Sequence, residues 1–293
     1  MTKNAGKRAL MIVNPRARRG AASIAPVRDF LASSGFRLID EQPTGGDSIS
    51  DLISRHADRC DLVIVGGGDG TLNAAASALV YTGLPLGVLP LGTANDFART
   101  MNIPLDPLKA AELIVQGRTK HVDLGEVNGH LFFNVASIGF SAELAAELTE
   151  HAKKRWGVLG YGIVAARILL RSRLFTAYLD HDGATEKIRT MQVSVGNGKH
   201  YGGGMTVEEK ASADDGWLDL YSLEVDHWWR LLRLLPSLRR GTQGQWDDVR
   251  AFKTTEITIR TKAPRPVNTD GELSTWTPAH FRIRPKSVIV YAP

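Results

Sequence analysis

One junction in the sequence constrains the fold more than any other: a short apolar run that ends in a glycine-rich turn. Residues 61–73 read DLVIVGGGDGTLN. The β-branched run from Asp61 to Val65 predicts a buried strand, and the alanine-rich run from Leu72 to Val80 predicts a helix. Glycines between a strand and a helix are expected to admit positive φ angles and to let the backbone approach a ligand closely.

The start of the predicted helix is a candidate phosphate site, because the first N–H groups of a helix have no partner within it. The carboxylate of Asp69 is expected beside these groups and favours a metal-bound or solvent-bridged phosphate over a bare one. A tight turn in which Thr71 caps the helix is the simpler alternative. The string is neither GxGxxG, because residue 71 is threonine, nor a P-loop, because no GK[ST] follows.

A second turn of the same kind follows the next apolar run. Leu86 to Pro90 predicts another strand, and a helix is expected to begin near Asn95 and to run to Met101. Between them, Thr93 can cap the helix or donate to a phosphate, and Asp96 adds a further acid. In an open α/β sheet such turns share one edge, at the carboxyl ends of the strands, where ligands bind.

A third acidic turn, Thr269-Asp270-Gly271-Glu272, lies near the end of the chain. Taken alone, two acids that flank a glycine also fit a solvated hairpin turn. The three turns gain meaning together, because they belong to a series of strings in a fixed order. These strings are Asn14-Pro15 followed by Gly20, GGGDGTLN at 66–73, PLGTANDFAR at 90–99, VDLG at 122–125, NVASIGFSAEL at 134–144, GNGKHYGGGM at 196–205, DDGWLDL at 214–220 and TDGE at 269–272.

With these strings the chain resembles the bacterial diacylglycerol kinase-like lipid kinases. Their catalytic domain is shared with sphingosine and ceramide kinases and, more distantly, with NAD kinases and phosphofructokinases. The GGDGT string alone is compatible with lipid and NAD kinases, whereas GTANDFA and the late DGE are specific to the lipid branch. The resemblance extends over nearly the whole chain.

The resemblance implies transfer of the γ-phosphoryl group of ATP to a lipid hydroxyl, with Mg²⁺ as the metal and diacylglycerol as the default acceptor. It places the acceptor-side base in TDGE, where Asp270 and Glu272 are both candidates. It also implies an acidic network around the magnesium that includes Asp96. The nucleotide-binding residues that it implies are Asn14, Thr44, Gly66, Gly67, Gly68, Asp69, Gly70, Thr71, Leu72, Thr93 and Asn95.

The resemblance implies a second magnesium site at Asp215, with backbone carbonyl groups of Ser212 and Trp217 as further ligands. A hairpin turn without an ion is the alternative there, because one carboxylate with two carbonyls is a weak magnesium signature.

Two other functions also stay open for the whole chain. One is a soluble-substrate kinase of the NAD kinase type, and the other is a catalytically silent nucleotide-binding regulator, although all four acids of the implied site are present.

The chain predicts two domains with the active site in the cleft between them. Residues 1–125 alternate strands and helices, which predicts an α/β nucleotide-binding domain with a parallel sheet. Residues 126–293 contain many short strands separated by turns, which predicts an antiparallel β-sandwich. The strands expected in this half are Leu131–Val135, Phe175–Leu179, Met191–Val195, Leu218–Leu223, Glu256–Arg260, Phe281–Ile283 and Val288–Tyr291.

Composition favours a soluble, cytoplasmic protein. The chain has 293 residues, 43% of them hydrophobic, so it can bury a large core. Its single cysteine, Cys60, excludes an internal disulfide framework and is consistent with a reducing compartment. The apolar stretch from Ala9 to Val13 is only one strand long and ends at Asn14-Pro15, so it is not a signal peptide, and no run is long and uncharged enough to span a bilayer.

An anionic partner is expected, because the formal net charge is +5 and the pI is about 9.3. Two basic segments with tryptophans and leucines, His151–Arg173 and His227–Arg240, suit peripheral contact with an anionic inner-membrane surface. Alternatively, their apolar side chains pack on the sandwich and the arginines face water. No nucleic-acid-binding module is recognisable, and a homodimer is left open.

Overall fold

The computed structural model describes residues 6–15, 17, 20–43, 48–147, 173–198, 200–201, 205–206, 212–225 and 249–293. Three of the sequence predictions fall outside these residues. They are the nucleotide contact of Thr44, the basic segment His227–Arg240 and, apart from Arg173, the basic segment His151–Arg173.

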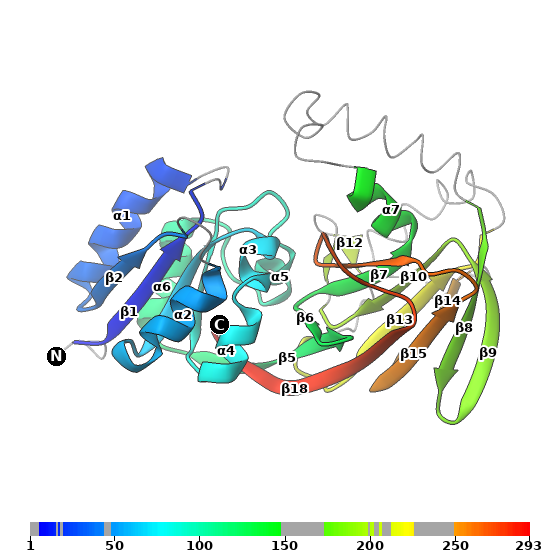
Figure 1. Ribbon diagram of the computed structural model, residues 1–293. Helices are drawn as coiled ribbons and strands as arrows, with labels where there is room; N and C mark the ends of the chain where they lie inside the picture. The colour runs from blue at the N-terminus through cyan, green and yellow to red at the C-terminus, as the bar shows by residue number, and fades with distance from the viewer. Residues whose placement is uncertain are drawn as a thin grey trace.

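The N-terminal half forms the predicted α/β domain. Four parallel strands lie in the order β2-β1-β3-β4, with bounds β1 (Arg8–Val13), β2 (Arg37–Glu41), β3 (Leu62–Gly67) and β4 (Leu86–Pro90). Helices α1 (Gly20–Ser33) and α6 (Pro107–Gln116) pack together on one face, and α2 (Ile49–His56) packs with α4 (Ala76–Thr82) on the other (Figure 1). Every residue of β3 and β4 is buried, as expected for strands covered by helices on both faces.

Three short helices complete this domain: η1 (Ala57–Arg59), α3 (Asp69–Asn73) and α5 (Asp96–Thr100). The prediction of one helix from Leu72 to Val80 was wrong, because the chain turns at residues 74–75 between α3 and α4. Ala75 is fully buried at this bend, so both short helices can pack on the core. The bend lets α3 lie at the edge of the sheet while α4 covers its face.

The C-terminal half forms the predicted antiparallel β-sandwich. One layer is a six-stranded sheet in the order β14-β13-β10-β7-β16-β17, with bounds β7 (Val135–Gly139), β10 (Gln192–Gly196), β13 (Leu218–Leu223), β14 (Val249–Thr254), β16 (Pro266–Thr269) and β17 (Glu272–Trp276). The other layer contains β5 (Thr119–Val127), β6 (His130–Phe132), β8 (Phe175–His181), β9 (Ala184–Thr190), β15 (Glu256–Thr261) and β18 (Ala279–Tyr291). Apolar side chains from both layers form one core between them. The small elements α7 (Phe140–Glu147), β11 (His200–Tyr201) and β12 (Met205–Thr206) lie outside these two layers.

The last strand, β18, connects the two domains. The sequence predicts two separate strands here, and that prediction was wrong, because Ala279–Tyr291 is one strand with an irregularity between Arg284 and Val288. Its first half pairs with β15, its end pairs with β4, and β5 follows it on the other side. Figure 1 shows this long red strand running from the sandwich back to the first domain.

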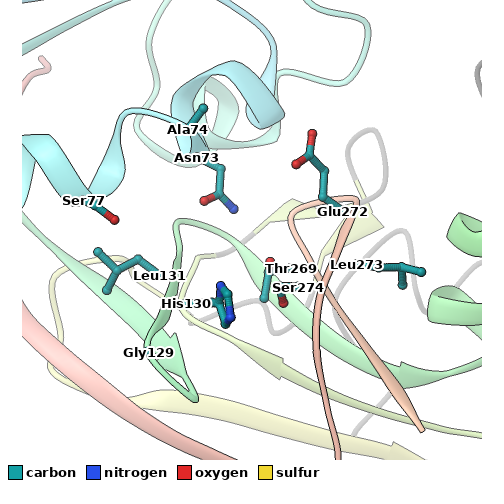
Figure 2. A pocket seen from close by; sticks show the side chains of 10 residues that line it. All are labelled: Asn73, Ala74, Ser77, Gly129, His130, Leu131, Thr269, Glu272, Leu273 and Ser274. Carbon is teal, nitrogen blue, oxygen red and sulfur yellow. The ribbon is translucent and has the colours of Figure 1, made fainter. Parts of the chain in front are cut away.

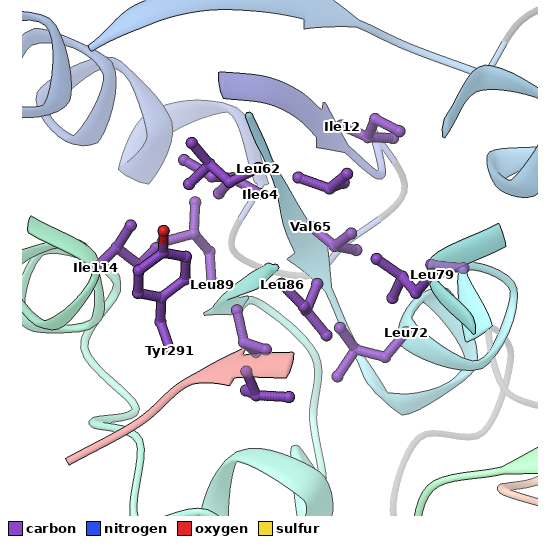
Figure 3. Packing of buried hydrophobic residues seen from close by; sticks show 14 of the residues in the cluster. Ile12, Leu62, Ile64, Val65, Leu72, Leu79, Leu86, Leu89, Ile114 and Tyr291 are labelled. Carbon is purple, nitrogen blue, oxygen red and sulfur yellow. The ribbon is translucent and has the colours of Figure 1, made fainter. Parts of the chain in front are cut away.

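The core of the α/β domain therefore includes the C-terminal end of the chain. Tyr291 is buried among residues of this core, near Ile114 of α6 and Leu89 of β4 (Figure 3). The division into residues 1–125 and 126–293 stays a prediction. The strand β5 crosses that boundary, and residues 288–292 join the first core.

Candidate active site

The first glycine-rich turn lies where the order of the parallel sheet reverses, between β1 and β3. Asn14 follows β1 and the glycine turn follows β3, and neighbouring strands of an open α/β sheet leave a crevice at such a switch point. The N–H group of Asn14 donates to the carbonyl oxygen of Gly66 over 2.9 Å. Its side-chain amide Nδ2 donates to the hydroxyl Oγ1 of Thr71 over 3.1 Å. Asn14 and Thr71, both predicted nucleotide-binding residues, therefore lie together.

The glycines of the first turn are needed for close approach and not for positive φ angles. Gly66, Gly67, Gly68 and Gly70 all lie outside the positive-φ region, so the expectation of positive φ was wrong. A Cβ atom on Gly92 would lie 2.5 Å from the Cα atom of Gly68, so the two turns touch backbone to backbone. A Cβ atom on Gly67 would lie 2.4 Å from Oγ1 of Thr71. A larger residue at position 92 would separate the two turns, and a larger residue at position 67 would displace Thr71 within the first turn.

Some of the N–H groups predicted to bind a phosphate already donate hydrogen bonds within the turn. The N–H groups of Thr71 and Leu72 donate to the carbonyl oxygen of Gly68, over 2.9 and 3.1 Å. The side chain of Leu72 is buried in the core and 2% exposed, so it offers no contact to a ligand. A phosphate at this turn would therefore depend on N–H groups earlier in the loop.

The second turn is closed by its own asparagine. Asn95 has a φ angle of 52°, its Oδ1 accepts from the N–H of Gly92 over 2.9 Å, and its Nδ2 donates to the Gly92 carbonyl over 3.1 Å. Asp69 joins this turn to the first, because its Oδ1 accepts from the N–H of Phe97 over 3.0 Å. Thr93 is exposed at the tip, whereas Asp96 is buried at the start of α5.

The acidic turn of residues 269–272 reaches this place from the far end of the sequence. It is the tip of the hairpin β16–β17, and Asp270 adopts a φ angle of 49° there. The Oδ2 atom of Asp270 accepts from the N–H of Phe133 over 2.7 Å and from Nδ2 of Asn73 over 3.2 Å. Its Oδ1 atom accepts from the N–H groups of Asn134 and Val135 over 3.0 and 3.1 Å. This carboxylate therefore fastens the hairpin to both domains.

Opposing effects act on the ionisation of Asp270. Burial raises the pKa of its carboxyl group to about 7, although the N–H groups of Phe133, Val135 and Asn134 favour the charged form and act against this rise. The nearby charge of Asp69 raises the pKa further. Asp69 and Asp270 thus form an acidic pair at the meeting point of the turns.

Glu272 lies at the same hairpin tip but faces open space. It is exposed, and its Oε1 atom is 3.2 Å from the position that a Cβ atom on Gly70 would take. It also lines a pocket of about 310 Å³ between the two domains. Figure 2 shows Glu272 reaching from its hairpin beside the helix that carries Asn73. The residues that line the pocket are Asn73, Ala74, Ser77, Gly129, His130, Leu131, Thr269, Glu272, Leu273 and Ser274.

Two asparagines that the sequence analysis did not select hold the acids in place. Asn73 donates to Asp270, and Asn134 donates through Nδ2 to Asp69 over 3.4 Å. The side chain of Asn134 is buried, and its Oδ1 atom has no hydrogen-bond partner among the described residues. Both asparagines lie in sequence motifs that carry the family resemblance. Their place in these motifs could have identified them as site residues.

At the predicted second metal site, the carboxylate of Asp215 already has protein partners. The Oδ2 atom of Asp215 pairs with the ammonium group of Lys253 over 2.6 Å, and its Oδ1 accepts from the N–H of Trp217 over 3.1 Å. The hydroxyl group of Ser212 donates to the carboxylate of Asp214. Because both oxygens of Asp215 have partners, the residues present do not fit a magnesium ion there. Within the part of the chain that the structure describes, no three histidine, cysteine, aspartate or glutamate side chains form a metal-binding group.

Comparison with known proteins identifies both halves of the chain. The family model for the diacylglycerol kinase catalytic domain matches residues 8–127. The model for the YegS C-terminal NAD kinase beta sandwich-like domain matches residues 134–292. This chain belongs to the diacylglycerol kinase-like lipid kinases.

Individual relatives agree with this assignment. The lipid kinase is 31% identical over 294 residues to a protein of Mycobacterium tuberculosis named "Diacylglycerol kinase", covering 96% of this chain and 94% of that protein. It is 34% identical over 235 residues to a Pseudomonas syringae protein named "Probable lipid kinase YegS-like", covering 79% of this chain and 75% of that protein. The crystal structure of a diacylglycerol kinase from Bacillus anthracis superposes with a TM-score of 0.79 at 27% identity, covering 98% of this chain and 97% of that chain.

Proposed function

We propose that this lipid kinase transfers the γ-phosphoryl group of ATP to the hydroxyl group of diacylglycerol. The observation that carries the proposal is the approach of Glu272 to Gly70, with Oε1 3.2 Å from the position of a Cβ atom on that glycine. A carboxylate and a glycine-rich turn from opposite ends of the sequence therefore meet beside a pocket. Relatives from Mycobacterium tuberculosis and Bacillus subtilis that are named diacylglycerol kinase support this acceptor.

Glu272 is the base in this proposal, and Asp270 positions it. A general base must reach the proton that it removes, and the carboxylate of Glu272 is exposed at the pocket. Both oxygens of Asp270 instead accept N–H groups, over 2.7 to 3.2 Å. Asp270 thus holds the hairpin tip while Glu272 receives the hydroxyl proton of the acceptor.

Asp69 is the residue proposed to hold a divalent cation together with the nucleotide. Mg²⁺ is usually bound through one or two carboxylates and the substrate phosphates, so a cage of three protein acids is not required. The buried, unpartnered Oδ1 atom of Asn134 adds an oxygen close to Asp69. When bound, the ion supplies positive charge that offsets the negative charge of the phosphates.

The pocket is proposed to receive only the hydroxyl-bearing end of the lipid. Its volume of about 310 Å³ is at the lower end for small-ligand sites, so it has no room for two long acyl chains. The chains would remain in the bilayer while the exposed side chains of Leu273 and Trp276, on β17, face the membrane. This gives peripheral membrane contact; in the described residues, no helix combines the length and apolar character needed to cross a bilayer.

The decisive experiment is a phosphorylation assay with labelled ATP and a panel of lipid alcohols in mixed micelles. We expect phosphatidic acid to form from diacylglycerol, and we expect the Glu272→Gln variant to lose this activity. Formation of ADP with NAD in lipid-free buffer would favour a soluble-substrate kinase instead. Binding of ATP without transfer to any acceptor would favour a silent regulator.

A further inference from the structure

Carboxylates gather around the turn of residues 212–217, which precedes β13. Asp215 lies in this turn, Asp219 follows it on β13, and Asp123 reaches it from β5. Asp123 is buried and accepts the N–H group of Gly216 over 2.7 Å. Like charges repel one another, and a cation placed among them offsets this repulsion.

Lys253 supplies this cation. It lies on β14, directly opposite Asp219 of β13 in the register of the two strands. Its ammonium nitrogen Nζ is 2.6 Å from Oδ2 of Asp215 and 3.8 Å from Oδ1 of Asp219. The shorter distance is typical of a charge-assisted hydrogen bond.

We infer that the ammonium group of Lys253 takes the place of a divalent cation at Asp215, so that this turn folds without a bound metal. An ammonium group is a compact charge with three donors, so it can serve one carboxylate and stay close to a second. A magnesium ion on the same oxygen, at about 2.1 Å, would face the ammonium charge at close range. The other oxygen of Asp215 already accepts the N–H group of Trp217.

This replacement bears on the active site, because the turn is linked to it through buried contacts. Gly216 donates to Asp123, whose carbonyl oxygen accepts Nδ2 of Asn197 over 2.8 Å. The same Nδ2 group donates to the carbonyl oxygen of Phe133 over 2.9 Å, and the N–H group of Phe133 donates to Asp270. Lys253, which lies on β14, thus stabilises the turn that contacts these residues, and this stabilisation does not depend on a bound metal ion.

Terbium luminescence provides a test that needs neither ATP nor lipid. Tb³⁺ binds at oxygen sites for hard cations, and it emits when a nearby tryptophan is excited. Trp217 is 44% exposed and only two residues from Asp215. We expect the wild-type protein to give no emission that depends on Trp217. The Lys253→Met variant should gain a saturable emission, because the carboxylates then lack their internal cation.

Control variants assign the signal to this turn. The chain has six tryptophans, so Trp217→Phe in the Lys253→Met background must abolish the gained emission. Asp215→Asn in the same background must abolish it as well. The Lys253→Arg variant keeps the positive charge and should remain silent like the wild type. Calcium ions should raise the Tm of Lys253→Met relative to the same variant in EDTA, and should leave the Tm of Lys253→Arg unchanged.

Two results would overturn the inference. One is Trp217-dependent emission from the wild-type protein, because a metal would then bind at the turn beside Lys253. The other is a folded Lys253→Met protein without gained emission. If Lys253→Met fails to fold, terbium emission from the wild type and from Lys253→Arg still tests the inference. Trp217-dependent emission from either protein contradicts it. A kinase assay that fails with every lipid would not affect these results.

Discussion

Two acid–glycine turns of the C-terminal domain look alike in sequence but are held in opposite ways. Asp270 is followed by Gly271, and Asp215 is followed by Gly216, with both glycines at positive φ. The carboxylate of Asp270 accepts N–H groups, three of them from the backbone. The carboxylate of Asp215 instead pairs with an ammonium group 2.6 Å away.

The difference lies in the kind of group that faces each carboxylate. N–H groups are dipoles without net charge, so they orient Asp270 and add no positive charge to the pair of Asp69 and Asp270. Lys253 carries a full positive charge and cancels that of Asp215. An acidic pair held by N–H groups next to a glycine-rich turn suits a metal-bound nucleotide, whereas a carboxylate paired with an ammonium group suits a structural turn. In the proposed function, the same motif serves binding in one place and folding in the other.

The largest effect is expected from Glu272→Gln, which removes the proposed base from the first turn without changing its shape. Turnover should fall by roughly 10²- to 10⁴-fold, the usual contribution of a general base. Because Glu272 is exposed, the free energy of unfolding should hardly change. Steady-state kinetics with diacylglycerol micelles measure the first quantity and urea unfolding the second. Glu256→Gln, the same change at an exposed glutamate on β15, is the control and should leave turnover unchanged.

Asp270→Asn should lower the free energy of unfolding. An amide has one acceptor oxygen, and its NH₂ group would face a backbone N–H group of residues 133–135. An unsatisfied buried donor costs about 1–3 kcal/mol. Asp182→Asn is a matched control, because Asp182 also has a positive φ and precedes a glycine in a hairpin, but its side chain is 87% exposed. Equal losses in both variants would show that the N–H contacts of Asp270 add nothing.

The raised pKa of Asp270 gives this variant a pH signature. Burial raises the pKa from 3.8 to about 7, so between these values the folded protein binds more protons at this group than the unfolded chain does. The stability contributed by Asp270 is therefore present at low pH and is lost as the pH rises toward 7. The difference in the free energy of unfolding between wild type and Asp270→Asn should shrink over this range. A difference that grows with pH would mean that the N–H donors outweigh burial.

An intermediate effect is expected from Gly92→Ala, which tests the contact between the two glycine-rich turns. The added Cβ atom would lie 2.5 Å from the Cα atom of Gly68, so the turns must move apart. Overpacking of this kind costs about 1–3 kcal/mol, and the affinity for ATP should fall with it. Gly198→Ala is the control, because its Cβ would meet neighbours only at 3.4 Å. Calorimetry that finds equal ATP affinity in both variants would place the nucleotide elsewhere.

Local patterns predicted the elements well wherever an apolar run ends at turn residues. The strands Leu86–Pro90 and Leu218–Leu223 have the predicted bounds. The pattern failed at β18, because charged residues near Arg284 interrupt its apolar alternation. Pairing with β5 along its length makes it one strand, and its end pairs Val290 with Leu86 from the first domain. Such pairing depends on tertiary structure that no local window contains.

For the candidate site too, local motifs predicted some features, and others depend on tertiary structure. The motifs were sufficient to select Asn14, the glycine turn, and the pair Asp270 and Glu272. The different surroundings of that pair could not be predicted, because the N–H groups that engage Asp270 come from residues more than a hundred positions away. The partner of Asp215 was missed for a related reason, since Lys253 lies on a strand that the sequence analysis did not predict.

The smallest effect is expected from Asp215→Asn, the counterpart of Asp270→Asn in the second turn. The side chains of Asp215 and Lys253 are 25% and 38% exposed, and ion pairs this close to water contribute about 0–1 kcal/mol. The amide oxygen can still accept from Trp217, and Lys253 keeps Asp219 as a neighbour. Urea unfolding should therefore show a smaller loss than for Asp270→Asn, and high salt should reduce it further, since salt screens an exposed pair. A salt-independent loss as large as that of Asp270→Asn would mean that the two turns contribute alike, and that the charge of Lys253 matters less than the shape of the turn.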